Sequence, residues 1–342
     1  MIDNYLVSVI IPHYNGVDTI LECIDSLKKS SKEKIQIIVV DNASTDNSVK
    51  ILKSKYDDIK LLECEKNYGY AEGCNKGADI AEGEYLIFLN NDTTHDENWI
   101  RYLVNTIEKN SNFSSVQPKI KNYTNKDSFD YAGGCGGELD IFCYPFTRGR
   151  IFNTVEKDYG QYDHTKKIFW ASGTAFITRK SIFKKVKGFD KMFFAHMEEI
   201  DYHWKCHLLG FDVGFTPDSV VYHKGAQTLN YGSSLKTYLN HRNSILLMSN
   251  FSFYFFMLLI IPKLILELIS VFYELFLGRF KHSFAIVKSL FWIFFHPKIM
   301  IKRIIQNSKL RKINDFKMMK YFYRGSIVIR YFIFFKKKYS SL

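Results

Sequence analysis

Residues 7–16 read VSVIIPHYNG, and residues 37–48 read IIVVDNASTDNS. Each stretch begins with β-branched apolar residues, which are typical of a buried strand, and ends in residues that favour turns. Apolar residues at helical spacing lie between the two stretches, at Ile20, Ile24 and Leu27. The order of strand, helix and strand predicts a βαβ unit with parallel strands and a right-handed crossover.

The same alternation continues along the chain and predicts an α/β fold, with a mostly parallel sheet that helices cover on both faces. We expect strands at 6–11, 36–40, 61–62, 85–89, 168–178 and 219–222, and helices at 73–81, 181–186 and 198–209. Residues 121–165 are rich in Gly, Asn, Asp and Tyr and lack a clear period, so we expect a loop region there.

Polar residues directly follow three of the predicted strands, at 12–15, 41–44 and 90–92. In open α/β sheets, ligands bind beyond the carboxyl ends of the strands. Because these ends meet at one edge of a parallel sheet, the sequence predicts a ligand site there.

The composition is that of a globular protein, because 46% of the 342 residues are hydrophobic and 24% are charged. These values exclude intrinsic disorder and fibrous repeats. The net charge of +12 is unevenly distributed, since residues 278–342 hold sixteen lysines and arginines against one acid, Asp315. The chain is therefore a mildly acidic body followed by a strongly basic, aromatic segment.

Six cysteines without CxxC spacing indicate reduced thiols rather than a disulfide framework. The first residues include an acid at position 3 and lack a small-residue cleavage site, so they do not read as a secretory signal. Both features favour a chain in the cytosol.

Residues 251–276 are almost entirely Phe, Leu, Ile, Val and Tyr. Drawn as a helix, this segment has its charges on one side and a wide apolar face on the other, as an interfacial helix would; the charges are Lys263, Glu267 and Glu274. A buried core helix is the alternative. The basic residues further along would strengthen binding to an anionic membrane surface.

We therefore predict two regions, a globular domain at 1–250 and a hydrophobic, basic, membrane-associating helical region at 251–342. The second region has too many aliphatic residues for a nucleic-acid-binding segment, so no nucleic-acid partner is expected. The pattern leaves open whether 251–276 spans the bilayer, enters it partway or lies on it. The oligomeric state is also left open.

An ordered set of motifs carries a resemblance to a known family. The two opening stretches are followed by NYGYAEGCNKGADIAEGEYLIFLNNDT at 67–93, WASGTAFITRKSIFKKVKGFD at 170–190 and VVYHKG at 220–225. Taken together, they resemble the glycosyltransferases of family 2, over roughly residues 5–250. The resemblance implies the GT-A fold, with a Rossmann-like domain that binds a nucleotide-diphosphate sugar, and transfer with inversion at the sugar.

The resemblance places the donor nucleotide at the strand ends. Asp41 would accept a hydrogen bond from the base, although a turn or helix-capping role is the alternative for this residue. Pro12, Tyr14 and Asn15 would form the other wall of the base pocket, with a turn proline and a packed tyrosine as simpler interpretations. The other donor-binding residues that the resemblance implies are Ser44, Asn67, Gly73, Asn75, Asn90, Asn91 and Arg242.

Asp92 is the residue that the resemblance assigns to Mg²⁺ or Mn²⁺ on the donor diphosphate, since hard cations prefer carboxylate oxygens. The family usually has Asp-x-Asp at this point, whereas this chain has the weaker ligand Asn90 in the first position. His223 matches a position that can complete the metal shell, and a strand-end histidine without a metal is its alternative.

Glu198, Glu199 and Asp201 match the acidic stretch that supplies the catalytic base in this family. Glu199 falls on the expected base, which removes a proton from the acceptor hydroxyl, and Glu198 is a competing assignment. Crowding of three acids would raise the pKa of one of them. An acidic first helical turn without a catalytic part is the alternative interpretation.

Four residues match a family segment on the acceptor side: Trp170, Ser172, Gly173 and Thr174. Trp170 could offer a stacking face to a sugar ring, and core packing is an equally good interpretation of it. For Arg242, which could bind a diphosphate oxygen bidentately, the alternative is a helix salt bridge.

The chain lacks the QxxRW motif of processive family members, so we expect transfer of one sugar. The motif pattern looks most like the rhamnosyltransferase-type branch, which implies dTDP-L-rhamnose as donor and a lipid-linked or polysaccharide acceptor in cell-surface glycan biosynthesis. The alternatives are a UDP- or GDP-hexose donor, or a non-catalytic basic scaffold. We expect the chain at the cytoplasmic face of the cell membrane, peripheral or monotopic.

Overall fold

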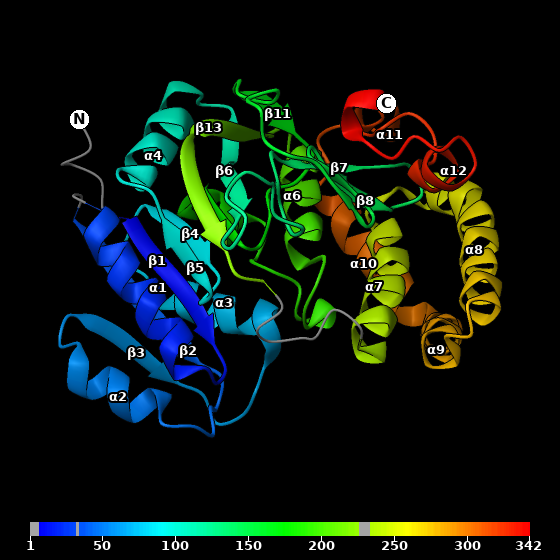
Figure 1. Ribbon diagram of the computed structural model, residues 1–342. Coiled ribbons are helices and arrows are strands. Elements are labelled where there is room, and N and C mark those ends of the chain that lie inside the picture. The colour runs from blue at the N-terminus through cyan, green and yellow to red at the C-terminus, as the bar shows by residue number, and fades with distance from the viewer. Residues whose placement is uncertain (1–6, 32–33, 226–232) are drawn as a thin grey trace.

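The computed structural model describes residues 7–31, 34–225 and 233–342. Its centre is a nine-stranded sheet with the order β11-β13-β6-β12-β4-β1-β2-β3, in which β5 pairs with β13 (Figure 1). The strands are β1 (Val7–His13), β2 (Ile35–Asp41), β3 (Ile59–Glu63), β4 (Tyr85–Leu89), β5 (Thr93–His95), β6 (Phe113–Asn122), β11 (Lys166–Ile168), β12 (Ala175–Arg179) and β13 (Asp212–His223).

Four neighbouring strands, β3, β2, β1 and β4, run parallel, as the βαβ pattern predicts. The register pairs His13 with Asp41 and Asp41 with Glu63, so these strands end side by side. The antiparallel strand β12 separates β4 from β6, which makes the whole sheet mixed. The α/β fold with a mostly parallel sheet is therefore confirmed.

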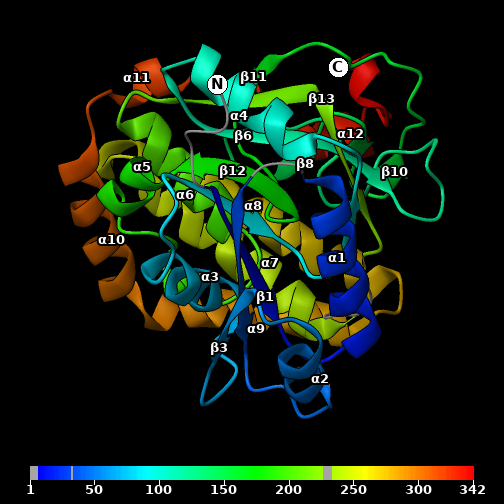
Figure 2. The same cartoon turned by 90° about the vertical axis from the view of Figure 1, so that its left-hand side faces the viewer.

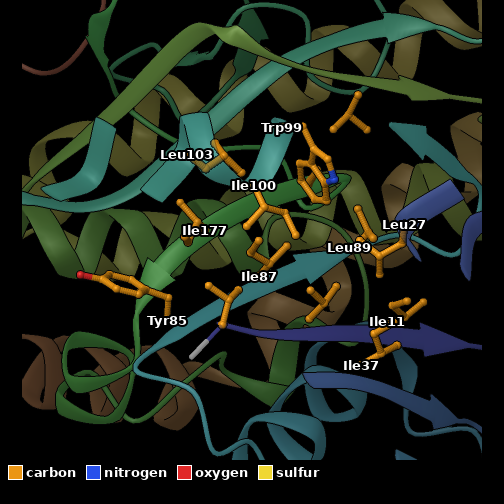
Figure 3. Packing of buried hydrophobic residues seen from close by; sticks show 14 of the residues in the cluster. Ile11, Leu27, Ile37, Tyr85, Ile87, Leu89, Trp99, Ile100, Leu103 and Ile177 are labelled. Atoms are coloured by element: carbon orange, nitrogen blue, oxygen red, sulfur yellow. The ribbon is translucent and has the colours of Figure 1, made fainter. Parts of the chain in front are cut away.

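Helices cover both faces of the sheet, and the rotated view places α1 and α3 on opposite sides of β1 (Figure 2). One face packs Leu27 of α1 and Trp99 and Leu103 of α4 against Ile87 and Ile177 (Figure 3). The other face buries side chains of α3, α5 and α6. The bounds are α1 (Val17–Ser30), α2 (Ser48–Lys55), α3 (Gly69–Asp79), α4 (Trp99–Lys109), α5 (Lys180–Lys185) and α6 (Glu198–Leu208).

Two predictions about the middle of the chain are corrected by the structure. Most of 121–165 lies outside helices and strands, as expected of a loop region, but four short strands form an antiparallel sheet there: β7 (Gly137–Leu139), β8 (Pro145–Thr147), β9 (Arg150–Ile151) and β10 (Thr154–Val155). Strands of two or three residues are too short to show an alternating pattern. The single strand expected at 168–178 is instead two strands, β11 and β12, because residues 169–174 leave the sheet.

The C-terminal helices pack on the body rather than apart from it (Figure 1). Phe251, Met300 and Phe322 share one apolar cluster with Phe169 and Trp204, so the predicted regions on either side of residue 250 have a common core. The remaining elements are α7 (Ser234–Leu247), α8 (Phe253–Phe276), α9 (Phe280–Phe295), α10 (Pro297–Leu310), α11 (Asp315–Met318) and α12 (Ile327–Phe332), with short 3-10 turns η2 (Lys191–Phe193), η3 (Met248–Asn250) and η4 (Tyr339–Ser341).

The charged side of α8 faces the protein interior. Lys263 and Glu267 are completely buried and form an ion pair of 2.8 Å. Glu267 also accepts a hydrogen bond from the Tyr144 hydroxyl at 3.0 Å and pairs with His241 of α7. The charged side of α8 is therefore a packing face, because the rest of the protein supplies the partners of Lys263 and Glu267.

The apolar side of α8 faces outward, together with exposed aromatic residues of α9. We call the following exposed residues of α8 and α9 the apolar surface: Phe253, Tyr254, Met257, Leu258, Ile261, Ile265, Leu268, Ile269, Phe272, Phe276, Phe280, Phe284, Phe291, Phe294 and Phe295. Of the described helices, α8 is the one that is by itself long and apolar enough to cross a bilayer. Only 17% of the most apolar 18-residue stretch of this helix is buried in the protein.

Replacing Glu267 with Gln should lower the free energy of unfolding by about 3 kcal/mol, because it leaves the buried Lys263 without its anion. Urea unfolding at neutral pH measures this loss. The control is Glu274→Gln on the same helix, whose partner Arg279 is 57% exposed, and it should cost less than about 1 kcal/mol. Equal losses for the two variants would contradict this account of α8.

Candidate active site

Three strand ends are bonded to one another at the edge where the sequence predicts a ligand site. The backbone N–H of Asn42 donates to the His13 carbonyl at 2.8 Å, and the N–H of Asn15 donates to Ser44 Oγ at 2.9 Å. Asn91 Nδ2 donates to His13 Nδ1 at 2.8 Å. The ends of β1, β2 and β4 therefore form one polar edge, as predicted.

Asp41 is buried at the end of β2 and has one oxygen engaged and one unengaged. Its Oδ2 accepts from the backbone N–H of Ser44 at 3.0 Å, which is the turn-forming role considered for this residue. Its Oδ1 has no hydrogen-bond partner among the described residues. A buried carboxylate oxygen without a hydrogen-bond donor lowers the stability of the fold. The N–H of a nucleotide base could supply that donor.

The other predicted wall of the base pocket lies beside Asp41. Pro12 is half-buried in β1, and Tyr14 is 37% exposed. Asn15 has φ of 56° and its Oδ1 accepts from the N–H of Thr45 at 2.8 Å, so it joins the turns after β1 and β2. These contacts shape the edge, and they leave the Tyr14 ring available to a ligand.

Asp92 and His223 meet at the end of β4, with Asp92 Oδ1 at 3.1 Å from His223 Nε2. His223 Nδ1 pairs with Asp130 at 2.9 Å, and Asn90 Nδ2 lies 3.4 Å from Nε2. Asp130 thus fixes the imidazole so that Nε2 points at Asp92, which is the arrangement of a carboxylate-supported metal ligand.

The two acids also set the charge of His223. Burial lowers the pKa of His223, but Asp92 and Asp130 outweigh it and raise that pKa well above its usual value. Burial raises the pKa of Asp92, and His223 outweighs it, so the pKa is lowered. Without a metal the two groups therefore form an ion pair, and a cation at Nε2 would have to displace the proton of the imidazole. No three His, Cys, Asp or Glu residues within 7–31, 34–225 and 233–342 could hold a metal alone, so a bound ion would need further ligands such as diphosphate oxygens.

Glu198 and Glu199 begin α6, and each has a carboxylate oxygen without a hydrogen-bond partner in the described part of the chain. Glu198 is 4% exposed, and burial and Glu199 raise its pKa well above the usual value. Glu199 is half-buried, and burial raises its pKa to about 7, opposed by hydrogen bonds from backbone groups such as Gly173. Burial therefore favours the neutral form of Glu198, and a pKa of about 7 leaves Glu199 poised between its two forms at neutral pH.

Asp201, the third predicted acid, is engaged by structural partners. It forms ion pairs of 2.6 Å with Lys205 of α6 and with Arg303 of α10. It also accepts a hydrogen bond from Asn250 Nδ2 at 2.8 Å. It is completely buried. Asp201 therefore joins α6 to α10, and this leaves Glu198 and Glu199 as the two acids of the stretch with unengaged oxygens.

The four predicted acceptor-side residues divide between the core and the site. Trp170 is 3% exposed, its Nε1 donates to the Glu138 carbonyl at 2.9 Å, and a Cβ on Gly137 would lie 2.0 Å from its ring. Trp170 is thus a core residue here. Ser172 and Thr174 are also buried. Gly173 lies at the site, since its carbonyl accepts from the Tyr70 hydroxyl at 2.5 Å and its backbone N–H contacts Glu199.

Most of the remaining predicted donor residues support loops. Asn75 bonds both the carbonyl and the N–H of Phe189, at 2.8 and 2.9 Å. Asn67 is exposed and accepts from the N–H of Gly69, and Gly73 packs against Asn42.

Arg242 is 8% exposed and its Nη2 donates to the carbonyls of Met192 and Phe193, at 2.8 and 3.1 Å. Its Nε and Nη2 also donate to Asn243 Oδ1. The alternative of a helix salt bridge is wrong for the described part of the chain, because these partners are carbonyl and amide oxygens rather than carboxylates.

Sequence reasoning missed Asp130, Tyr70 and His13. Asp130 lies in the segment expected to be a loop region, and it contacts His223 across 93 positions of sequence. Tyr70 reaches Gly173 across 103 positions. No local pattern signals such contacts, although His13 lies within the quoted PHYN stretch.

Comparison with known proteins places this arrangement in a family. A "Glycosyltransferase GlyG" of Streptococcus pneumoniae is 32% identical over 128 residues, which cover 36% of this chain and 41% of that protein. An N-acetylglucosaminyl-diphospho-decaprenol L-rhamnosyltransferase of Mycobacterium tuberculosis is 20% identical over 242 residues, which cover 66% of this chain and 78% of that protein. The chain thus spans less than half the length of the first of these relatives.

A solved structure shares the fold. The crystal structure of GalNAc-T7 with UDP, GalNAc and Mn²⁺ matches with a TM-score of 0.58 and 18% identity, over 73% of this chain and 49% of that one. The family model "Glycosyl transferase family 2" matches residues 8–187, which contain all of β1 but its first residue, the polar edge and Asp92. The fold is therefore GT-A-like, and the chain belongs to glycosyltransferase family 2.

Proposed function

We propose that this protein is an inverting glycosyltransferase that moves one sugar from a nucleotide-diphosphate sugar to a lipid-linked or polysaccharide acceptor in cell-surface glycan biosynthesis. The observation that carries the proposal is Glu199, a half-buried carboxyl at the start of α6 with a pKa raised to about 7. Such a group accepts a proton efficiently near neutral pH. Family membership supports the choice of donor class.

Glu199 acts as the general base in this proposal. It takes the proton of the acceptor hydroxyl while that oxygen attacks the anomeric carbon from the side opposite the leaving diphosphate. The Gly173 N–H holds the carboxylate in place during the transfer. Burial and the neighbouring Glu199 raise the pKa of Glu198 and favour its neutral form, so we assign the base to Glu199.

The donor diphosphate lies at the polar edge in this proposal, with the base against Asp41 and Tyr14. Asp92 and His223 would hold Mg²⁺ or Mn²⁺, and such an ion would neutralise charge on the departing nucleoside diphosphate. Asp130 keeps the His223 imidazole oriented toward Asp92. Most of the rate then comes from positioning and electrostatic stabilisation.

dTDP-L-rhamnose is our preferred donor, and a UDP- or GDP-hexose is the alternative. The motif pattern and the mycobacterial rhamnosyltransferase relative support rhamnose. A panel of these donors, offered with polyprenyl-diphosphate-linked sugars as acceptors, tests the proposal by mass spectrometry and proton NMR of the product. We expect addition of one sugar with inverted anomeric configuration. Retained configuration, or no transfer from any donor, would overturn it.

We also place the protein at the cytoplasmic face of the cell membrane, with α8 lying along the bilayer surface. The buried pair of Lys263 and Glu267 ties one side of α8 to α7, and the apolar surface faces away from the body. The strongly basic segment 278–342 complements an anionic leaflet. A lipid-linked acceptor would present its sugar at the same surface.

The double variant Phe272→Glu/Phe276→Glu should abolish salt-resistant flotation with phosphatidylglycerol vesicles, because the two rings are 68% and 88% exposed on the apolar surface. Each buried aromatic contributes about 1.5–3 kcal/mol, so binding should weaken by far more than 10-fold. The control Tyr159→Glu changes an aromatic that is 80% exposed outside that surface and should bind as wild type does. Flotation of the double variant in high salt would contradict this placement.

A further inference from the structure

The segment 194–197, immediately before the two glutamates, has a backbone that side chains rarely adopt. Phe194, His196 and Met197 have φ values of 62°, 68° and 71°. The N–H of Ala195 donates to the Phe193 carbonyl at 2.7 Å, which closes a tight γ-turn around Phe194. Such conformations persist only where the surrounding structure imposes them. Other elements must therefore hold this segment.

Asn243 of α7 holds the segment from one side. Its Nδ2 lies within hydrogen-bond distance of three backbone carbonyls, at 3.1 Å from Phe193, 3.0 Å from Ala195 and 2.7 Å from His196, and they share its two hydrogens. The side chain is completely buried. Removal of this amide would leave all three carbonyls without that donor.

Arg242 fixes the orientation of the Asn243 amide. Its Nε and Nη2 donate to Asn243 Oδ1 at 2.9 and 2.6 Å, so that oxygen faces the guanidinium. Nδ2 then has to face the segment. Because Nη2 of Arg242 also donates to the Met192 carbonyl, the two neighbours act on the backbone together.

Helix α3 holds the segment from the other side. The N–H of Ala71 donates to the Phe194 carbonyl at 3.2 Å. Gly69 allows this approach, since a Cβ there would lie 2.5 Å from the same carbonyl oxygen. The segment is thus fixed between α3 and α7, and it continues directly into Glu198 and Glu199.

We propose that Asn243 is a positioning residue for the glutamates at the start of α6. Its amide sets the path of 193–197 and thereby the point at which Glu199 enters the site. This inference rests on the proposed function, because it assigns to Asn243 an effect on the step that Glu199 performs. It also assigns the Arg242–Asn243 pair to support of the backbone, a role different from diphosphate binding.

The variant Asn243→Ala should lower kcat about 100-fold and leave the Kd for the nucleotide sugar within threefold of wild type, because small displacements of a catalytic group have effects of this size. Initial-rate kinetics and calorimetry measure the two quantities. The control is Asn307→Ala, which removes another buried amide, bonded to the Ser249 carbonyl and to Asn250 Oδ1. It should lower the melting temperature and keep kcat within threefold.

Two further measurements separate positioning from general support of the fold. In Asn243→Ala, the midpoint of the acid limb of kcat should move, because Glu199 changes its surroundings, which include Glu198, Asp201 and Tyr70. Asn307→Ala should leave that midpoint in place. Gly69→Ala places a Cβ against the Phe194 carbonyl and so displaces the segment from the side of α3. It should give the same loss of kcat with unchanged donor binding. This variant replaces Asn243→Ala in the test if Asn243→Ala does not fold.

A wild-type kcat and pH profile in both Asn243→Ala and Gly69→Ala would overturn the positioning role while leaving the proposed function intact. Loss of donor binding in proportion to kcat would overturn it as well, and would point to diphosphate binding by this pair. If the wild type transferred no sugar from any donor, the proposed function and this inference would fail together.

Discussion

Glu199→Gln should lower kcat by about 100- to 10,000-fold while the donor binds as tightly as to wild type. A positioned general base contributes about 10²–10⁴-fold to a proton-transfer step, and the amide of Gln cannot accept the proton. Glu199 touches the Gly173 N–H, and Gln keeps an oxygen for that contact. Steady-state transfer rates and calorimetric donor affinities, taken from the same preparation, measure the two effects.

The neighbouring glutamate provides a matched control for this prediction. Burial and Glu199 raise the pKa of Glu198 well above its usual value, which favours the neutral carboxyl that a Gln side chain resembles. Glu198→Gln should therefore keep kcat within about 10-fold of wild type. A greater loss in Glu198→Gln than in Glu199→Gln would assign the base to Glu198 instead.

The pH dependence follows from the same assignment. The base must be ionised to accept a proton, and burial raises the pKa of Glu199 to about 7. The rate kcat should therefore rise with pH up to and through about 7, and then level off. The two glutamates interact, so the midpoint belongs to the pair. Glu199→Gln should lose this acid limb.

Asp92→Ala should weaken Mn²⁺-dependent binding of the nucleotide sugar by about 100-fold or more, since loss of a metal's supporting partner alone typically costs 10–100-fold. Asp92 supplies the carboxylate that faces His223 Nε2 at 3.1 Å, so its removal leaves the imidazole and the Asn90 amide as protein ligands. Calorimetry with and without Mn²⁺ measures the change.

Asp96→Ala is the control for Asp92→Ala. Asp96 lies four residues along the chain, is exposed, and has a weak contact of 3.4 Å with the Tyr222 hydroxyl. It should leave nucleotide affinity and its metal dependence unchanged. Unaltered Mn²⁺ dependence in Asp92→Ala would show that the Asp92–His223 pair is no metal site.

The parallel half of the fold could be predicted because its signals are local. The runs at 7–11 and 37–40 are almost entirely apolar, and polar residues follow each of them within two positions. Parallel strands place such residues at one edge, so Asp41 and Asp92 could be assigned to a shared site before any contact was known.

The rest of the site depends on contacts between distant segments. Asp130 lies 93 positions from His223, and Asn243 lies 47 to 50 positions from the carbonyls that it bonds. Strands of two or three residues, such as β9, carry no period that would have placed Asp130 in ordered structure. The identity of a residue states its chemistry, but the partner it meets is set by tertiary packing.

Helix α8 illustrates the same limit. The sequence places Lys263 and Glu267 on one side of a helix, and that much is confirmed. Whether this side meets water or protein depends on Tyr144 and His241, which lie elsewhere in the chain. The helix's own pattern could not distinguish the two environments, and the interior environment is the one adopted.

The measurement that tests the account most directly is calorimetry of the wild-type protein with dTDP-rhamnose, UDP-sugars and GDP-sugars, each with and without Mn²⁺. We predict that sugars of one nucleotide class bind, and that binding requires the metal. In this account the unengaged oxygen of Asp41 accepts a hydrogen bond from the base, and Asp92 and His223 bind the cation on the diphosphate. If no nucleotide sugar binds under any metal condition, the proposed glycosyl transfer is contradicted.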